Sequence, residues 1–216
     1  MTDYSRPRRE MVERLSANAP FPPSEEVLNA MKEIPRHCFV EKPLWHRAYS
    51  DCSLPIGRGQ TISQPATVLS MLSAVNPAPG STMLEIGTGS GYLAAVASRI
   101  CRRVYGLELM LDLVHHSRRI LLSLGITNVS ISYGDGSEGW PRHAPYDCIL
   151  CSAGAPALPP ALLRQLAEGG RLGIPVGTRE SQRFEVWTVE RGVPRKLPQE
   201  FPCVFVPLTG KSGWNG

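Results

Sequence analysis

The spacing of apolar residues changes near residue 80. In residues 1–80 they recur every three or four positions and predict amphipathic helices over 8–15, 24–34 and 65–75. Ser24 is a favourable N-cap for the second helix, and Pro35 ends it. Residues 45–65 hold prolines and glycines among polar side chains, which predicts an ordered loop or short strands. We expect residues 1–80 to form an N-terminal helical extension that carries this loop.

Beyond residue 80, apolar runs of strand length alternate with helical patterns. Strands are predicted over 83–86, 103–108, 128–133, 146–151 and 171–175, and helices over 91–100, 111–124 and 159–167. Such alternation predicts an α/β fold with a doubly wound, mostly parallel, Rossmann-like sheet. Two more strands, over 184–190 and near 203–207, have no helix between them and predict a hairpin that gives the sheet an antiparallel edge. Residues 81–216 are therefore expected to form one compact core.

A glycine-rich turn follows the first predicted strand of this core, with glycines at 87, 89 and 91 and Glu85 before them. Glycines allow the backbone to pass close to a bound cofactor. Dinucleotide-binding turns need a further glycine where this chain has Tyr92. The spacing suits S-adenosylmethionine, which has no phosphate and carries an ammonium group that Glu85 can meet. An ordinary strand–helix turn is the alternative that this motif alone leaves open.

Two more strand ends carry acidic residues. Glu108 lies about twenty residues beyond the glycine turn, where a carboxylate commonly accepts the ribose hydroxyls of a nucleoside. Asp135-Gly136 ends the third strand and can meet an adenine amine, although a plain Asp-Gly turn would look the same. The ends of parallel strands gather at one edge of the sheet. The sequence therefore predicts an S-adenosylmethionine site at that edge.

The composition is that of a globular protein, with 42% apolar and 19% charged residues among 216. No apolar run reaches the roughly 18 residues of a membrane span and no apolar segment follows the N-terminus, so we expect a cytoplasmic protein without a membrane partner. The net charge of +4 and the separated basic doublets indicate solvated faces and no nucleic-acid partner. Cys148-x-x-Cys151 lies in an apolar strand pattern without a second pair or a nearby His, so buried thiols and no metal are expected.

Several segments in order along the chain together resemble one enzyme family. They are Leu54 to Pro65 with its Gly-x-Gly-Gln-Thr-Ile-Ser-x-Pro pattern, Leu84 to Tyr92, 134–136 with 139–141, 169–172 and 205–208. The sequence is similar to the protein-L-isoaspartate (D-aspartate) O-methyltransferase family. The resemblance implies methyl transfer from S-adenosylmethionine to the free carboxylate of L-isoaspartyl residues in damaged proteins and peptides. The ester then closes to a succinimide, which begins repair, and S-adenosylhomocysteine is the other product.

The resemblance also implies roles for individual residues. Ser63 matches the active-site serine of the family, and Thr61 can supply a second hydroxyl to the acceptor carboxylate. A carboxylate is already ionised at neutral pH, so no strong general base is required. Without the resemblance, Ser63 reads as a loop hydroxyl bonded to backbone. The implied cofactor-binding residues are Gln60, Ile62, Glu85, Gly87, Thr88, Gly89, Ser90, Glu108, Leu109, Met110, Asp135, Gly136 and Thr209.

The chain departs from the family pattern at Leu93, Ser137 and Gly154, which concerns cofactor packing and turnover more than the reaction class. One alternative is a related methyltransferase that esterifies ordinary Asp in a specific peptide. Another is a non-catalytic adaptor that recognises isoaspartyl proteins. A nucleic-acid methyltransferase is disfavoured, because Ser152-Ala153 stands where amine methylation of bases needs an Asp/Asn-Pro-Pro-aromatic turn. We expect a monomer.

Overall fold

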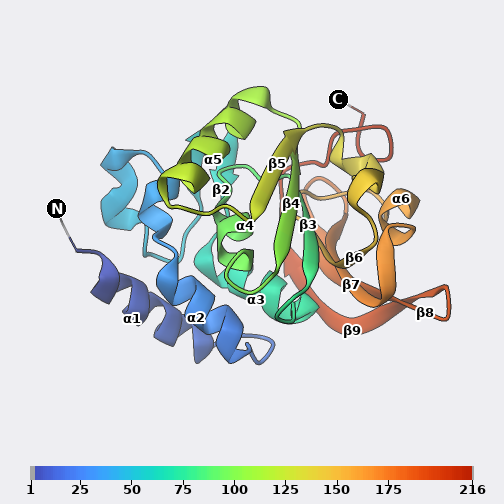
Figure 1. Ribbon diagram of the computed structural model, residues 1–216, viewed down its shortest axis with the longest axis horizontal. Coiled ribbons are helices and arrows are strands. Elements are labelled where there is room, and N and C mark those ends of the chain that lie inside the picture. Colours follow the sequence, from blue (N-terminus) through green and yellow to red (C-terminus); the bar gives the residue numbers. More distant parts are fainter. Residues whose placement is uncertain (1–2, 216) are drawn as a thin grey trace.

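The computed structural model describes residues 3–215, which build a seven-stranded sheet in the order β5-β4-β3-β6-β7-β8-β9 (Figure 1). Pairing from β5 through β7 is parallel, and β8 and β9 are antiparallel to their neighbours. The predicted mostly parallel, doubly wound sheet with an antiparallel edge is confirmed. The strands are β3 (Thr82–Ile86), β4 (Arg103–Glu108), β5 (Val129–Tyr133), β6 (Tyr146–Cys151), β7 (Leu166–Gly177), β8 (Gln182–Glu190) and β9 (Val193–Cys203).

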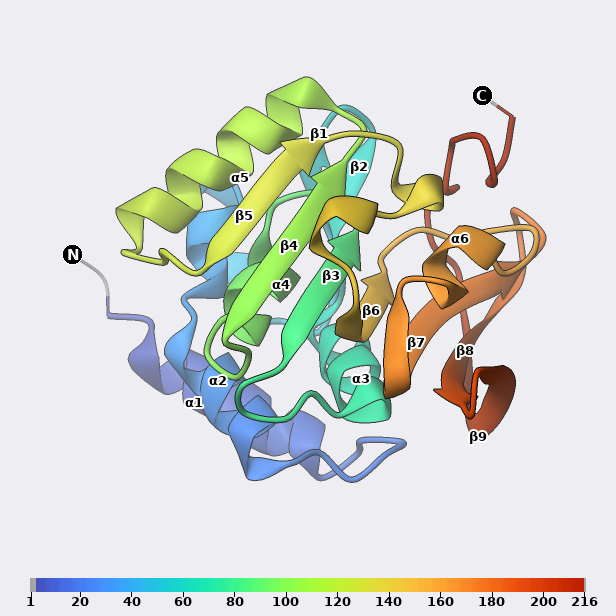
Figure 2. The same ribbon diagram turned by 45° about the vertical axis from the view of Figure 1, so that its right-hand side comes forward.

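Helices cover the sheet unequally on its two faces (Figure 2). One face packs against α3, α4 and α5, with α1 and α2 behind them, and these elements share one apolar core with the sheet. The other face carries only α6 and the short 3-10 turns η3 and η4. The bounds are α1 (Ser5–Ser16), α2 (Glu25–Glu33), α3 (Pro65–Val75), α4 (Tyr92–Ala97), α5 (Leu111–Ser123), α6 (Pro160–Leu163), η3 (Gly136–Glu138) and η4 (Pro141–His143).

The N-terminal extension contains the three predicted helices. Ser24 caps α2 by accepting a hydrogen bond from the amide of Val27 at 3.4 Å, and the helix ends before Pro35 as expected. Two 3-10 turns follow, η1 (Arg36–Phe39) and η2 (Lys42–Arg47). A small antiparallel hairpin then forms from β1 (Leu54–Gly57) and β2 (Gln60–Ile62), in the segment predicted as ordered loop or short strands. In residues 3–215, no helix is long and apolar enough to cross a bilayer.

The predicted helix over 159–167 is wrong in its second half. Only Pro160–Leu163 is helical, and β7 begins at Leu166, which pairs with Tyr146 across an irregularity in the register. Gly169 lies within β7 and takes a φ of +72° there. The backbone there runs so close to its neighbours that a side chain at Gly170 would lie 2.9 Å from the carbonyl oxygen of Asp147.

The predicted final strand near 203–207 is also misplaced. The hairpin partner of β8 is Val193–Cys203, joined through Arg191 and Gly192, both with positive φ. This strand contains Pro194, Pro198 and Pro202, which normally argue against a strand. They are tolerated because β9 is an edge strand that pairs only with β8. The antiparallel hairpin edge itself is confirmed.

Candidate active site

A cavity of about 190 Å³ lies where the strand order reverses, between β3 and β6. In doubly wound sheets a ligand crevice lies at this position, beyond the carboxyl ends of the strands. Its walls come from the end of the β1–β2 hairpin, the turn from β3 into α4, the end of β4, and a C-terminal segment over 206–209. The cavity therefore lies between the N-terminal extension and the core.

Nearly all of the predicted site residues line this one cavity. They are Gln60, Thr61, Ile62, Ser63, Glu85, Gly87, Thr88, Gly89, Ser90, Glu108, Leu109, Met110, Gly136 and Thr209. Asp135 is the exception. Residues from five separate parts of the sequence thus meet at one place, as the strand-end argument requires.

The glycine turn is held open by its own backbone and by Glu108. Gly87, Gly89 and Gly91 have φ angles of +74°, +50° and +85°, a region that other residues rarely adopt. One carboxylate oxygen of Glu108 accepts from the amide of Gly89 at 2.8 Å, and the other accepts from the amide of Met110 at 2.9 Å. Each oxygen keeps a second lone pair. Glu108 therefore shapes the turn while it lines the cavity.

Glu85 is a buried carboxylate with one unpartnered oxygen. Its side chain is 1% exposed and lines the cavity. Oε1 accepts from the hydroxyl of Ser152 at 3.3 Å, whereas the buried Oε2 has no hydrogen-bond partner. Burial raises the pKa of Glu85 well above its ordinary value, and the nearby charge of Glu108 adds to this. A cationic ligand group would satisfy the free oxygen and stabilise the ionised carboxylate.

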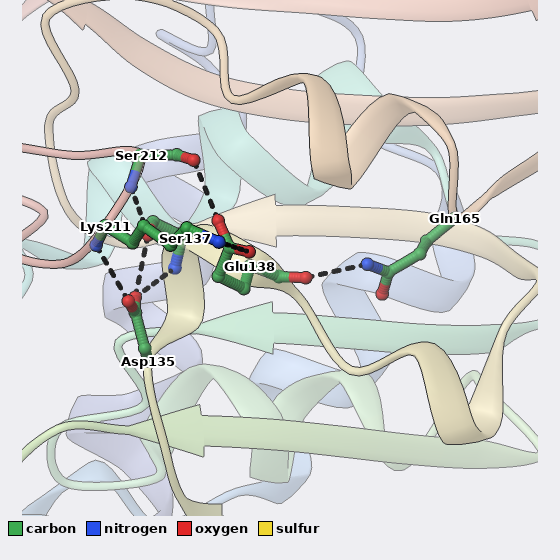
Figure 3. A network of polar contacts seen from close by, with 6 residues as sticks. All are labelled: Asp135, Ser137, Glu138, Gln165, Lys211 and Ser212. Carbon is green, nitrogen blue, oxygen red and sulfur yellow. Dashed lines mark hydrogen bonds and ion pairs between the residues drawn. The ribbon is translucent and has the colours of Figure 1, made fainter.

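Asp135 does not line the cavity, and its carboxylate contacts Lys211 of the C-terminal segment (Figure 3). Oδ1 accepts from the amide and hydroxyl of Ser137, and Oδ2 accepts from the amide of Lys211 at 2.8 Å. Burial would raise the pKa of Asp135, but these hydrogen bonds leave it below its ordinary value. Ser212 adds bonds to Ser137 and Glu138, so this polar network fastens the C-terminal segment beside η3.

Gly136 lines the cavity at a position where the backbone leaves no room for a side chain. A Cβ built there would lie 2.3 Å from Cγ2 of Ile86. The loop after β5 therefore passes directly against the end of β3. This close approach is independent of any ligand, and only glycine allows it without a shift of the neighbouring strand.

Hydroxyl groups line the part of the cavity next to the β1–β2 hairpin and the end of β6. Thr61, Ser63 and Ser152 line both the first cavity and an adjoining groove of about 470 Å³. One wall of the groove carries Gln64, Thr67 and Ser70 near the start of α3, and the other is the segment 201–206. Among residues 3–215, no charged side chain lines the groove. The hydroxyls thus stand where the cavity meets the groove.

Ser152 was not among the predicted site residues. Its amide donates to the carbonyl of Ile86 at 2.8 Å, which continues the parallel pairing of β3 with β6 past Cys151. The hydroxyl then reaches Glu85. The only sequence signal was its position after a strand. Other lining residues not predicted include Val68, Ile86, Tyr92, Leu93, Leu107, Gly134, Ala153, Val206, Pro207 and Leu208.

The three departures from the family pattern all lie near the site. Leu93 is buried and lines the cavity. Ser137 accepts from the amide of Ser212 at 2.9 Å. Gly154 exchanges backbone hydrogen bonds with Val206 and Leu208, which holds the C-terminal segment across the site.

The family model for protein-L-isoaspartate (D-aspartate) O-methyltransferases matches residues 6–213. The chain belongs to this family. A protein-L-isoaspartate O-methyltransferase from Syntrophotalea carbinolica is 48% identical over 99% of this chain and 98% of its own length. One from Synechococcus is 53% identical over 84% of this chain and 77% of the relative. These matches do not favour the two alternatives, an Asp-specific peptide methyltransferase and a non-catalytic adaptor.

Solved structures agree with the family assignment. A protein-L-isoaspartate O-methyltransferase superposes with a TM-score of 0.83 at 29% identity, over 95% of this chain and 67% of the other. A Plasmodium falciparum structure described as a putative member, in complex with S-adenosyl-L-homocysteine, gives 0.79 at 27% identity over 94% and 98%. The family uses S-adenosylmethionine. Within residues 3–215 no cluster of His, Cys, Asp or Glu has the grouping of a metal site.

Proposed function

We propose that the protein methylates the free carboxylate of L-isoaspartyl residues in damaged proteins and peptides, and so starts their repair through a succinimide. The observation that supports this proposal most strongly is that two complementary groups of residues line one cavity. A buried glutamate with a free oxygen lies at one end, and a group of uncharged hydroxyls lies where the cavity opens into the groove. The first suits a cationic donor, and the second suits an anionic acceptor.

On the donor side, Glu85 would bind the ammonium group of S-adenosylmethionine, because its Oε2 is buried and lacks a partner. Glu108 would accept the ribose hydroxyls with the lone pairs that Gly89 and Met110 leave free. The turn glycines let the backbone approach the ligand. When bound, S-adenosylmethionine supplies an electrophilic methyl group on a sulfonium, and the chain's own residues orient it and exclude water. Thr209 and the rest of segment 206–209 would close the cavity.

The adenine end would lie beside Gly134 and Gly136. The direct adenine contact of Asp135, implied by the resemblance, stays a prediction. It requires an oxygen that already accepts from Ser137 or Lys211 to accept a further hydrogen bond. The contacts favour a first role for Asp135 in fastening the C-terminal segment.

On the acceptor side, Ser63 and Thr61 would donate their hydroxyl hydrogens to the carboxylate that is to be methylated. No side chain needs to remove a proton, because the acceptor is already ionised. The step neutralises a carboxylate, so a site of uncharged donors avoids holding the ester product too tightly. The flanking residues of the acceptor would lie in the groove beside segment 201–206.

An assay with labelled donor tests the proposal. The protein is incubated with methyl-labelled S-adenosylmethionine and either an isoaspartyl peptide or the same peptide with ordinary aspartate. Base-labile methyl ester on the isoaspartyl peptide alone is expected. Equal or greater label on the ordinary peptide would contradict the substrate, and donor binding without methyl transfer to either would support the adaptor alternative. A cytoplasmic location, a monomeric state and the absence of nucleic-acid partners remain proposals from the sequence.

A further inference from the structure

Arg36 carries a fully buried positive charge that the roles assigned above do not use. Its side chain is 0% exposed. Nη1 donates to the carbonyl of Ala48 at 2.6 Å, and Nη2 donates to the carbonyls of Cys52 at 3.1 Å and Ser63 at 2.9 Å. Nε has no partner. Among residues 3–215 no acidic side chain forms an ion pair with Arg36.

The three carbonyls come from separate segments of the N-terminal extension. Ala48 follows η2, Cys52 precedes β1, and Ser63 lies in the turn from β2 into α3. The guanidinium also lies 5.8 Å from the ring centre of Tyr92, a buried residue at the start of α4 that lines the cavity. Arg36 therefore connects the segment that bears the acceptor hydroxyls to the helix that follows the glycine turn.

Burying such a charge opposes folding by several kcal/mol unless it is well compensated. Desolvation lowers the pKa of Arg36, yet an arginine remains protonated at any physiological pH. An apolar side chain could fill the same space without this penalty. The planar fork of arginine, however, can hold several carbonyls at fixed angles, which the single ammonium of lysine reproduces poorly.

We propose that Arg36 is a positioning residue for the acceptor half of the reaction. By holding the carbonyl of Ser63, it fixes the backbone from which the Ser63 and Thr61 hydroxyls face the acceptor. The inference rests on the proposed function, since it assumes a carboxylate acceptor at these hydroxyls.

The test compares Arg36→Lys with Arg8→Lys. Arg8 is a matched control, because its Nε also donates to a backbone carbonyl, that of Lys32 at 2.6 Å, in the same extension but away from the cavity. For Arg36→Lys we expect kcat/KM on an isoaspartyl peptide to fall about tenfold or more, while the Kd for S-adenosylhomocysteine changes less than about twofold. Arg8→Lys should leave both values near those of the unchanged protein.

Hydrogen exchange gives a readout that does not depend on turnover. In Arg36→Lys with bound S-adenosylhomocysteine, the amides of residues 61–64 should exchange faster, and those of β3 and α4 should not. If S-adenosylhomocysteine binding is lost with activity, Arg36 supports the fold as a whole and the proposal is overturned. Unchanged kcat/KM would overturn it too. If the unchanged protein methylates no isoaspartyl peptide, the proposed function fails separately, and the exchange result still decides whether Arg36 holds the loop.

Discussion

Replacing Glu85 by glutamine tests the donor side of the site most sharply. The substitution keeps the size and shape of the side chain and removes its charge. A hydrogen bond to a charged partner in a buried site contributes about 1.5–3 kcal/mol. Since each 1.4 kcal/mol is a factor of about ten, the Kd for S-adenosylhomocysteine should rise about 10- to 150-fold. Isothermal titration calorimetry measures this Kd directly for the Glu85→Gln variant and for the unchanged protein.

The effect must depend on the ligand's amine. An S-adenosylhomocysteine analogue without the amino group should bind Glu85→Gln and the unchanged protein with nearly equal Kd. The coupling free energy between the Glu85→Gln substitution and the removal of the ligand's amino group then measures the contact between Glu85 and that amine. Equal weakening for both ligands would show that the substitution disturbs the cavity generally, and an unaltered Kd for S-adenosylhomocysteine would refute the assignment of Glu85.

The same carboxylate predicts a pH dependence. The pKa of Glu85 is raised by burial, and a bound ammonium would lower it. Binding should therefore release a proton, and the affinity should tighten as pH rises through the pKa of the free protein. An α-amino group has a pKa of about 7.7 or higher, so below about pH 6.7 the ligand's own amine stays charged and does not contribute to this dependence. Glu85→Gln should show no such dependence.

In the ligand-free protein, Glu85→Gln should not weaken the fold, in contrast to its expected weakening of ligand binding. A carboxyl whose folded pKa lies above its unfolded pKa destabilises the fold at pH values above both. At neutral pH, ligand-free Glu85→Gln should therefore unfold at the same temperature as the unchanged protein or at a higher one. A clear fall in its Tm would mean that the charge of Glu85 is already compensated within the protein.

Three other substitutions test separate parts of the structure. Gly136→Ala should lower the free energy of unfolding by about 1–3 kcal/mol, because its Cβ would overlap Ile86; an unchanged urea midpoint would contradict this. Val204 is 69% exposed in the groove wall, so Val204→Asp should lower kcat/KM about fivefold or more on a long isoaspartyl peptide. Val193→Asp, at an exposed valine of β9 outside the groove, should leave kcat/KM unchanged. Equal losses in the two variants would contradict the groove as the binding path of the acceptor peptide. Asp135→Asn should lose about 1 kcal/mol of unfolding free energy at pH 7, and the difference should disappear as pH falls through the lowered pKa of Asp135; a difference that persists at pH 2 would contradict the hydrogen-bond assignment.

The parallel half of the sheet was predictable because its signals are local. Buried strands read as short apolar runs, and the predicted bounds of β4 and β6 match the structure. Helix ends were marked by residues with a direct physical role, such as Ser24 at the start of α2 and Pro35 just after its end. The glycine turn was recognisable because its three glycines are required by backbone angles.

The antiparallel edge was harder because its signals are tertiary. Residues 193–203 are polar and hold three prolines, and nothing local reveals that one side of the strand needs no partner. The apolar run after it looked like a strand. Instead Val206 and Leu208 flank Gly154 and bring the chain across the cavity. Long-range pairing, not local preference, sets this part of the fold.

The candidate site shows the same division. The turn glycines and Glu108 could be predicted from a motif and its spacing, whereas Ser152 is a single serine after a strand. Only the parallel register of Ile86 with Cys151 brings Ser152 beside Glu85. The contact of Asp135 with Lys211 could not be predicted from the sequence either, because Lys211 lies 76 residues further along the chain.

A crystal structure with S-adenosylhomocysteine and an isoaspartyl peptide would test the central claim most directly. We expect the ligand's amine within hydrogen-bond distance of Oε2 of Glu85, its ribose at Glu108, and its sulfur facing the peptide carboxylate between Thr61 and Ser63. A ligand with its amine elsewhere, or a peptide carboxylate bound away from the two hydroxyls, would contradict the proposed arrangement of donor and acceptor.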